Sequence, residues 1–371
     1  MKVVLICDFL NQWGGAERVL LALCNIFPKA PIYTLIYNPQ KTLNKFSGKK
    51  IITSPLQKNP LAHAKPQWFI NQYQKAIESF NLEGFDLIIS SSSAFAKGIK
   101  KPKGAVHICY CHTPMRYSWD WTKEYIKEAN IKNPLRTYVN IVIHKLRLWD
   151  QKNSQNVDLF IANSTNVKKR IAKYYKKEAV VIYPPVDTKK FIPWDNKKEN
   201  YFLHVGRLSP YKKLDLVIDA FHKLGLPLKV VGEGKEKKKQ QKTIHKNIEF
   251  TGQVSDEKLV KLYQRAKALI FAADEDFGLV PVEAIATGTP VIAYKKGGVL
   301  ESVIEGVNGL FFDNQTKESL IKAVQKFLKS ENKFNQQKII ESARKFNQDI
   351  FEEKIRKVVK EFYEKAKNRQ S

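Results

Sequence analysis

Short apolar runs alternate with longer amphipathic stretches along most of the chain. A run such as residues 3–7, in which every position is apolar, is typical of a strand buried on both faces of a sheet. The stretch at residues 16–26 instead has apolar residues at helical spacing. Repeated alternation of the two patterns indicates βαβ units, and therefore parallel sheets covered by helices.

The alternation occurs in two series with a break between them. Pro184 and Pro185 do not suit the interior of a helix or a central strand, and residues 189–200 are polar without apolar periodicity. The first series predicts strands at 3–7, 32–36, 87–90, 106–110, 159–162 and 180–182, with helices at 16–26, 66–80 and 166–175. The second predicts strands at 201–205, 229–231, 248–250, 268–271, 291–293 and 310–312, with a helix at 255–266 that begins at an N-cap serine.

These series predict an α/β protein with two Rossmann-like, doubly wound domains that face each other across a cleft, at residues 1–185 and 186–348. Apolar residues at helical spacing after Asp349 predict that residues 349–371 form a helix that crosses back to the N-terminal domain. The length of 371 residues agrees with two domains, because one core rarely grows beyond about 250–300 residues.

The composition limits where the protein works and what it binds. No apolar run is long enough to span a bilayer, and Asp8 interrupts the apolar N-terminus, so we expect a cytoplasmic protein. The four cysteines lack a second pair of metal ligands, which favours buried structural thiols in a reducing compartment. The net charge is +28, but no nucleic-acid-binding motif accompanies it, so we expect no nucleic-acid partner.

An anionic membrane surface is a second partner that the basic charge suggests. Residues 58–75 interleave lysines with large apolar side chains: Lys58, Lys65 and Lys75 with Leu61, Trp68, Phe69 and Tyr73. This pattern predicts peripheral docking on the inner face of the cell membrane, although aromatic residues on a helix that faces the core would give the same pattern.

Ligands of parallel α/β sheets bind at the carboxyl ends of the strands, so the loops that follow strands are the places to look for chemistry. Gly14 and Gly15 follow the first predicted strand and open a helix, where backbone amides approach an anion closely. An ordinary tight turn would also place two glycines there. In the second series, Arg207 and Lys212 follow the first strand, and together they can reach one diphosphate.

An acidic loop follows a later strand of the second series. Glu275 lies in this loop, and a helix is expected to begin near Pro281, with Glu283 close to its start. Amides at such a helix start attract a phosphate or a sugar, and carboxylates accept hydrogen bonds from sugar hydroxyls. In the first series, His112 follows the strand at 106–110, although a single histidine is more often structural.

Together these motifs resemble the family 4 retaining glycosyltransferases, which have the GT-B fold. The resemblance covers nearly the whole chain, and the segments HTPMRYSWD and PYKKLDLVIDAF are most similar to bacterial mannosyltransferases of O-antigen and related polysaccharide synthesis. The motifs that carry it are Gly14-Gly15, His112-Thr113-Pro114, Gly206-Arg207 with Lys212, Glu275 and Glu283 in EDFGLVPVEA, Gly288-Thr289-Pro290 and Gly297-Gly298.

The resemblance implies a role for each group in a metal-independent transfer of a hexose. Arg207 and Lys212 would neutralise the donor diphosphate, a task otherwise given to a divalent ion. Glu283 would hold the ribose hydroxyls, and His112 would contact the sugar and the developing charge. The remaining donor contacts would come from Gly14, Gly15, Glu275 and the amides of Phe277, Gly278 and Leu279, and the N-terminal acceptor site would include Arg116, Tyr117 and Trp119.

The resemblance also implies the substrates. The donor would be GDP-mannose, bound as a substrate without any further cofactor, and the acceptor would be a lipid-linked or oligosaccharide chain. A UDP-sugar donor, carrying glucose or N-acetylglucosamine, is the first alternative, since the sequence shows no residue that would distinguish a guanine base from a uracil base. A polyanion-binding protein that carries an inactive GT-B scaffold is the alternative of another class.

Overall fold

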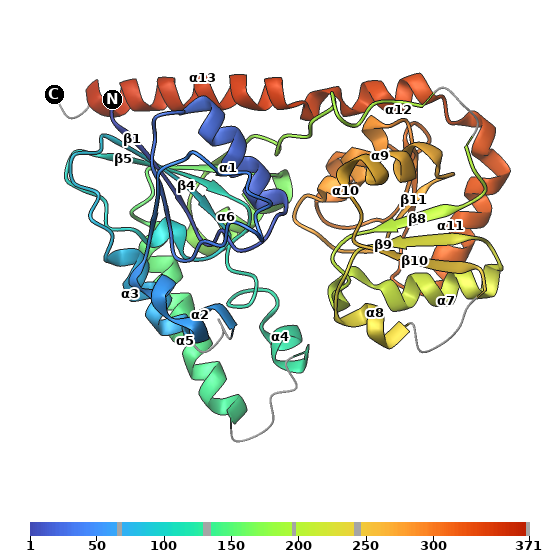
Figure 1. Cartoon of the computed structure of the whole chain (residues 1–371), viewed down its shortest axis with the longest axis horizontal. Helices are drawn as coiled ribbons and strands as arrows, with labels where there is room; N and C mark the ends of the chain where they lie inside the picture. The colour runs from blue at the N-terminus through green and yellow to red at the C-terminus, as the bar shows by residue number, and fades with distance from the viewer. Residues whose placement is uncertain (65–68, 129–134, 195–197, 241–245, 369–371) are drawn as a thin grey trace. The chain divides into compact units, whose positions relative to one another are not determined.

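The computed structural model describes residues 1–64, 69–128, 135–194, 198–240 and 246–368. The chain divides into two compact units (Figure 1). Unit 1 consists of Met1–Pro185 together with Asp349–Ser371, and unit 2 consists of Val186–Gln348. Each unit contains one parallel sheet with helices on its faces.

Unit 1 has a seven-stranded sheet in the order β3-β2-β1-β4-β5-β6-β7, and each neighbouring pair is parallel. Its strands are β1 (Val3–Cys7), β2 (Ile32–Thr34), β3 (Ile51–Thr53), β4 (Leu87–Ser92), β5 (Val106–Cys111), β6 (Leu159–Ala162) and β7 (Ala179–Val181). Its helices are α1 (Gly15–Ile26), α2 (Pro60–Ala64), α3 (Ile70–Glu78), α4 (Thr122–Glu128), α5 (Leu135–Ser154), α6 (Thr165–Tyr175) and α13 (Gln348–Asn368).

Side chains that alternate along each strand divide the core of unit 1 between the two faces of the sheet. Leu5 of β1 packs in a cluster with residues of α1 and α13, such as Leu23 and Ile355. Its neighbours Val4 and Ile6 belong to a different cluster, which contains residues of α3 and α5. Both faces are therefore covered, which explains why the strands read as continuous apolar runs.

Unit 2 has a six-stranded sheet in the order β10-β9-β8-β11-β12-β13, also parallel throughout. Its strands are β8 (Phe202–Val205), β9 (Leu228–Val231), β10 (Ile248–Gly252), β11 (Leu269–Phe271), β12 (Val291–Tyr294) and β13 (Gly309–Phe312). Its helices are α7 (Leu214–Leu224), α8 (Lys235–Gln240), α9 (Asp256–Arg265), α10 (Leu279–Ala286), α11 (Lys317–Ser330) and α12 (Gln336–Ala343). Figure 1 shows α7 and α11 on one side of the sheet and α9 and α10 on the other.

The two parallel-sheet units confirm the predicted α/β class, but some elements differ from the sequence prediction. The strand β3 and the helix α5 were not predicted, and the apolar residues of α5 lie on both its buried and its exposed sides. The predicted helix at 66–80 is shorter as described, with α3 at Ile70–Glu78, and residues 65–68 lie outside the described residues. The four cysteines are buried free thiols, as expected.

Two aromatic residues of the segment that predicted membrane docking belong to the core, whereas Lys58, Leu61 and Lys75 are exposed. Phe69 and Tyr73 are buried and pack in the cluster that covers one face of the unit 1 sheet, so these aromatic residues do not face solvent. Lys65 and Trp68 lie outside the described residues. Within the parts of the chain that the structure describes, every helix is too short or too polar to cross a membrane.

One buried histidine in each sheet makes the stability of the protein depend on pH. Burial lowers the pKa of His107 in β5 to about 3, and that of His204 in β8 to about 4. Below about pH 6.5 the unfolded chain therefore binds protons that the native histidines do not. The free energy of unfolding falls as the pH drops from about 6.5 toward 4, by up to ~1.4 kcal/mol per pH unit for each histidine.

We therefore predict that His204→Gln has a shallower pH dependence of unfolding than the wild type. Urea unfolding between pH 7 and pH 4.5 measures this slope, and only the slope counts, since the substitution also changes packing at every pH. The control variant is His222→Gln, which removes an imidazole at an exposed position. Equal slopes for both variants would show that His204 is not the group that titrates.

Candidate functional site

The predicted site residues fall into two groups, one in each unit, and each group lies in the loops and helix starts that follow the carboxyl ends of strands. Unit 2 contains Arg207, Lys212, Glu275, Phe277, Gly278, Leu279 and Glu283. Unit 1 contains Gly14, Gly15, His112, Arg116, Tyr117 and Trp119.

The loop after β8 is held closely against the loop after β9. A Cβ atom on Gly232 would lie 1.9 Å from the carbonyl oxygen of Gly206, so only glycine permits this approach. The amide of Leu208 donates to the carbonyl of Glu233 at 2.9 Å, which ties the two loops together. Arg207 lies between these fixed points, and its side chain is exposed.

Lys212 ends the short 3-10 helix at Pro210–Lys212 and is almost completely buried, with 7% of its surface exposed. Burial lowers its pKa, but the ion pair and hydrogen bond with the Glu275 carboxylate act together with Tyr211 in the opposite direction, and the pKa is raised above its ordinary value. Arg207 lies close enough to act in the opposite direction on the same pKa. The structure therefore brings the two predicted cations together and adds Glu275 as the partner of the buried one.

The backbone of the acidic loop is fixed by two glycines that follow β12. Glu275 forms an isolated parallel bridge with Gly297, and the amide of Gly298 donates to the carbonyl of Glu275 at 2.8 Å. A Cβ atom on Gly297 would lie 2.4 Å from that carbonyl oxygen, and one on Gly298 would lie 2.2 Å from the carbonyl oxygen of Asp276. The Gly297-Gly298 motif is therefore needed for close packing against the acidic loop.

The helix after the acidic loop begins at Leu279, two residues before the position that the sequence predicted. Gly278 precedes it with a φ of 86°, a backbone conformation that L side chains rarely adopt. Phe277 is buried with its ring 5.5 Å from that of Phe346, which anchors the entry to the helix. The N–H groups of Leu279 and Val280 are in the first turn, where helices offer amides to anions.

Glu283 lies in the second turn of α10 and is buried. The hydroxyl of Tyr263 in α9 donates to its Oε2 at 2.9 Å. This bond fixes the orientation of a carboxylate that can also accept from ligand hydroxyls. Unit 2 thus combines two clustered cations, two carboxylates and a helix start, a set suited to a phosphorylated sugar compound.

In unit 1, His112 directly follows β5 and is half-buried. Its Nε2 lies 2.8 Å from the hydroxyl oxygen of Ser91 on the neighbouring strand β4, and its carbonyl accepts from the side-chain amide of Asn163 at 2.9 Å. These contacts hold the imidazole at the carboxyl edge of the sheet, where the sequence placed it.

A pocket of about 260 Å³ opens beside Ser91, at the ends of β1 and β4 and the start of α1. Gly14 and Gly15 immediately precede its lining residues Ala16 and Glu17. The lining also includes Asp8, a carboxylate that sequence analysis did not assign to the site. The signal was present, because Asp8 directly follows a buried strand.

Asp8 fixes one wall of this pocket. Its carboxylate accepts from the backbone amides of Ser93, Ala94 and Ala96 at 2.6, 2.9 and 2.6 Å. Burial raises its pKa, although these three hydrogen bonds act in the opposite direction. Asp8 therefore ties the end of β1 to the loop after β4, and that loop leads to Lys97.

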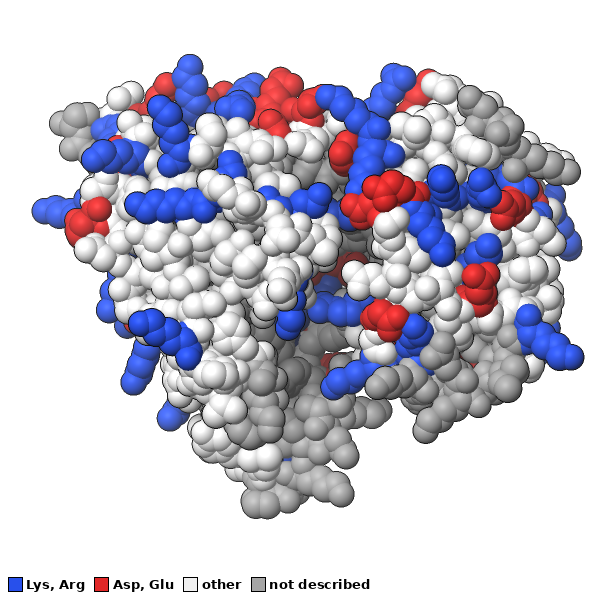
Figure 2. Space-filling model, viewed as in Figure 1, with Lys and Arg blue, Asp and Glu red and all other residues white. Residues whose placement is uncertain are grey.

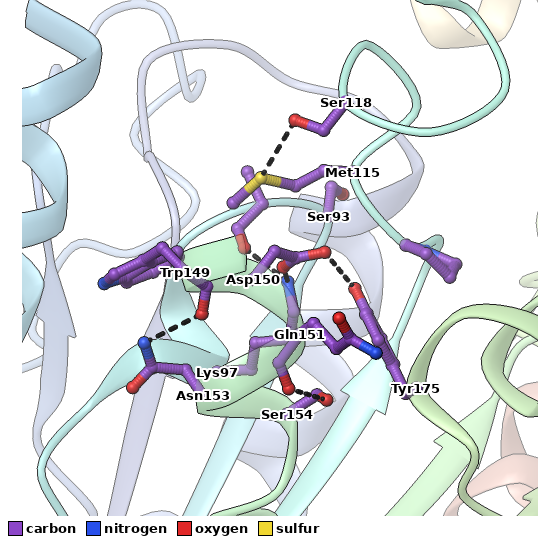
Figure 3. Close-up of polar contacts among 12 residues, drawn as sticks. Ser93, Lys97, Met115, Ser118, Trp149, Asp150, Gln151, Asn153, Ser154 and Tyr175 are labelled. Carbon is purple, nitrogen blue, oxygen red and sulfur yellow. Dashed lines mark hydrogen bonds and ion pairs between the residues drawn. The ribbon is translucent and has the colours of Figure 1, made fainter. Parts of the chain in front are cut away.

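Lys97 and Asp150 form a completely buried ion pair behind this loop, with Nζ 2.6 Å from Oδ1 (Figure 3). Lys97 also donates to the carbonyl of Ala94, and the hydroxyl of Tyr175 donates to Asp150 at 2.8 Å. Burial lowers the pKa of Lys97, but Asp150 reverses the shift and the pKa is raised. Removing one partner would leave an uncompensated buried charge, which typically costs about 3–5 kcal/mol.

This ion pair also supports the segment that contains the predicted acceptor residues. The indole N–H of Trp119 donates to Asp150 at 2.8 Å, and its ring stacks on Tyr174 with centroids 4.6 Å apart. Arg147 of α5 donates to the carbonyl of Ser118 at 2.7 Å. Trp119 is therefore held by its neighbours on several sides.

The other two predicted acceptor residues are half-buried. The guanidinium of Arg116 lies 4.9 Å from the ring of Trp121, and the carbonyl of Tyr117 accepts from Thr122. Their role toward an acceptor stays a prediction. Among the described residues, His, Cys, Asp and Glu side chains nowhere gather in threes as they do around a metal ion.

The two units define a GT-B glycosyltransferase fold, and comparison with known families agrees. The glycosyltransferase family 4 model matches residues 13–190, and the model for glycosyl transferases group 1 matches residues 185–346. The chain is a glycosyltransferase of the family 4 type.

Individual relatives extend over much of the chain. An uncharacterised glycosyltransferase of Methanocaldococcus jannaschii is 28% identical over 74% of this chain and 76% of its own length. The O-antigen chain mannosyltransferase C of Escherichia coli is 25% identical over 49% of this chain and 54% of its own length. The crystal structure of Anabaena HepE in complex with UDP-glucose has a TM-score of 0.72 at 19% identity, and the match covers 97% of this chain and 100% of that one.

The two glycine contacts permit a steric test of the unit 2 site. Gly297 and Gly306 both have positive φ values, 80° and 78°, so an alanine at either position strains the backbone, and urea unfolding measures the strain of each variant. Only at Gly297 would the new Cβ meet the acidic loop, because nothing lies within 4 Å of the one at Gly306. We predict that Gly297→Ala weakens binding of a nucleoside diphosphate by roughly tenfold or more, since small displacements of binding groups are costly.

Calorimetric titration with UDP and with GDP measures this effect, and urea unfolding checks that both variants are folded. Gly306→Ala should bind nucleotide like the wild type. If the two variants bind equally well, the loop that contains Glu275 is not part of the nucleotide site.

Proposed function

We propose that unit 2 binds a nucleoside diphosphate hexose and that the enzyme transfers the hexosyl group to an acceptor with retention of configuration. The observation that carries this proposal is the arrangement of Arg207 and the buried Lys212 beside Glu275 and the start of α10. A diphosphate has the charge to interact with both cations, and a hexose has the hydroxyls to donate to the carboxylate.

The proposed reaction exchanges one glycosidic bond for another. The bond between the anomeric carbon and the donor phosphate breaks, and a bond to the acceptor oxygen forms on the same face of the sugar. The acceptor proton passes to the leaving phosphate, so no enzymic nucleophile is required. Arg207 and Lys212 stabilise the negative charge that develops on the leaving diphosphate.

The pairing of Lys212 with Glu275 fits this role. An arriving diphosphate offers Lys212 a second anionic partner, so the cation stays compensated while Glu275 turns to the sugar hydroxyls. His112 at the edge of the unit 1 sheet is proposed to contact the sugar and the developing charge. Its bond to Ser91 supports a fixed orientation for this contact.

GDP-mannose is the donor that we propose first, and a lipid-linked or oligosaccharide chain in surface polysaccharide synthesis is the acceptor. The similarity to an O-antigen chain mannosyltransferase supports a mannosyl donor and an acceptor in polysaccharide synthesis. A UDP-sugar is the second candidate donor, because the structurally similar HepE was crystallised with UDP-glucose. A non-catalytic polyanion-binding protein would have no need for Lys212, Glu275 and Glu283 in this arrangement.

Replacing Glu275 and replacing Glu283 by alanine should impair different steps, catalysis in the first case and nucleotide binding in the second. Glu275→Ala should lower kcat by roughly 10² or more, because it removes a contact to the reacting sugar, with a modest effect on nucleotide affinity. Glu283→Ala should weaken binding of the free nucleoside diphosphate by about 1–3 kcal/mol, since it removes a charged hydrogen-bond acceptor for ribose. It should therefore raise KM and leave kcat nearly unchanged.

Calorimetry with nucleotide alone and steady-state kinetics separate these effects. Tyr263→Phe is the matched control for Glu283→Ala, because it removes the hydroxyl that donates to Glu283 and keeps the carboxylate, so its effect on affinity should be smaller. Loss of nucleotide binding in Glu275→Ala alone would reverse the two roles. Near wild-type behaviour of both variants in both assays would reject the proposed site.

Turnover is expected to require no divalent ion, because Arg207 and Lys212 supply the positive charge at the diphosphate. Donor hydrolysis and transfer measured in excess EDTA should equal the rates with added magnesium. Activity that disappears in EDTA and returns with magnesium would contradict this part of the proposal.

A further inference from the structure

The helix α5 exposes a regular stripe of apolar and basic side chains to solvent. Tyr138, Ile141, Lys145, Leu148 and Lys152 follow one another at alternating intervals of three and four residues, which places them along one side of a helix. All five are exposed, and the three apolar members have 60%, 50% and 53% of their surfaces accessible. We call these five residues the α5 stripe.

The opposite side of the same helix is anchored in unit 1. Ile143, Leu146, Asp150 and Ser154 are buried, and Leu146 packs in the core cluster that covers the sheet. Asp150 additionally forms the buried ion pair with Lys97. The outward direction of the α5 stripe is therefore fixed by the fold, so its exposure is not the result of a loosely attached helix.

The exposed charged side chains of α5 are all basic. Asp150 is the single carboxylate in Leu135–Ser154, and it is buried and compensated by Lys97. The basic residues of the helix are Arg136, Lys145, Arg147 and Lys152, of which Lys145 and Lys152 belong to the α5 stripe. On the face shown in Figure 2, the lower part of unit 1 is mostly uncharged, with a few lysine and arginine side chains at its left side and little Asp or Glu.

We propose that the α5 stripe docks unit 1 onto an anionic lipid bilayer. Tyrosine, isoleucine and leucine side chains enter the boundary between headgroups and acyl chains, while the lysines contact anionic headgroups. Lysine suits this position because its aliphatic stem lies along apolar surface while its ammonium group stays at the headgroups.

Charge complementarity favours a bilayer over the other partners that an exposed helix can have. A contact with a second copy of the chain would gather the lysines of two stripes in one interface, with no carboxylate on either stripe to compensate them, and like charges would repel. A nucleic acid would match the lysines but would leave three large apolar side chains in water.

Membrane docking deepens the proposed function. It rests on that function in one respect: a lipid-linked acceptor is the reason why the enzyme would dock. The same helix supports the acceptor segment, because Asp150 accepts from Trp119 and Arg147 donates to Ser118. Docking by α5 would therefore hold this segment at a fixed height above the bilayer. This surface replaces residues 58–75, whose aromatic residues Phe69 and Tyr73 are in the core.

Vesicle co-sedimentation of the full chain tests the proposal without donor or acceptor. The probes are vesicles of phosphatidylcholine alone and vesicles that also contain phosphatidylglycerol, at low and high salt. The test variant is Ile141→Ser/Lys145→Glu/Leu148→Ser/Lys152→Glu, and the matched control is Ile192→Ser/Lys322→Glu/Leu328→Ser/Lys329→Glu in unit 2. The control changes the same residue types at exposed positions and lowers the net charge to the same extent.

The wild type should bind the anionic vesicles, more weakly at high salt, and should bind phosphatidylcholine weakly or not at all. The test variant should lose affinity by roughly tenfold or more, whereas the control should lose much less. Thermal unfolding checks that each variant is folded. If the test variant does not fold, Lys145→Glu/Lys152→Glu alone, which changes only exposed lysines, must reduce anionic binding.

Three results would overturn the proposal: no binding of the wild type to anionic vesicles at low salt, equal losses in the test and control variants, or a wild-type dimer that the test variant converts to a monomer without any vesicle binding. Donor hydrolysis in the absence of vesicles is measured beside these assays. It reports the proposed transfer chemistry alone, so failure of docking and failure of the proposed function are distinguishable.

Discussion

Parallel pairing of the strands is the constraint on which the rest of this structure depends. In a parallel sheet all strands end at the same edge, so residues that are far apart in sequence meet there. In unit 1 this edge receives Asp8 and His112, and in unit 2 it receives Lys212 and Glu275. The chemistry of the protein is therefore located by topology first and by local loop conformation second.

Each unit also contains a buried lysine that is paired with a carboxylate. Lys97 in unit 1 and Lys212 in unit 2 are almost without solvent contact, and each is compensated by one carboxylate. The pair in unit 1 is further satisfied by neighbouring donors and supports a segment of the candidate site. The pair in unit 2 is proposed to exchange partners when a diphosphate binds. A buried ion pair therefore holds a segment of the candidate site in unit 1, and is proposed to take part in donor binding in unit 2.

The sequence predicted the two sheets well, because buried parallel strands appear as plain apolar runs such as Val3–Cys7. It also predicted that Arg207 and Lys212 lie close together, since both follow one strand. It could not predict the Lys97–Asp150 pair, because these residues are 53 positions apart and each looks like an ordinary surface charge. The sequence left open whether Phe69 and Tyr73 face a membrane or the core, because a pattern of lysine and aromatic residues does not show which side of a helix is buried, and the structure places both in the core.

The central claim is that unit 2 recognises a nucleotide sugar and activates it for transfer. The most direct measurement is thermal stabilisation and donor hydrolysis across a panel of GDP-mannose, UDP-glucose and UDP-N-acetylglucosamine, with DNA and heparin as polyanion references. Our account predicts clear stabilisation by one nucleotide series and hydrolysis of the matching donor, with GDP-mannose expected first. Stabilisation by DNA or heparin, together with no response to any nucleotide or nucleotide sugar, would contradict it.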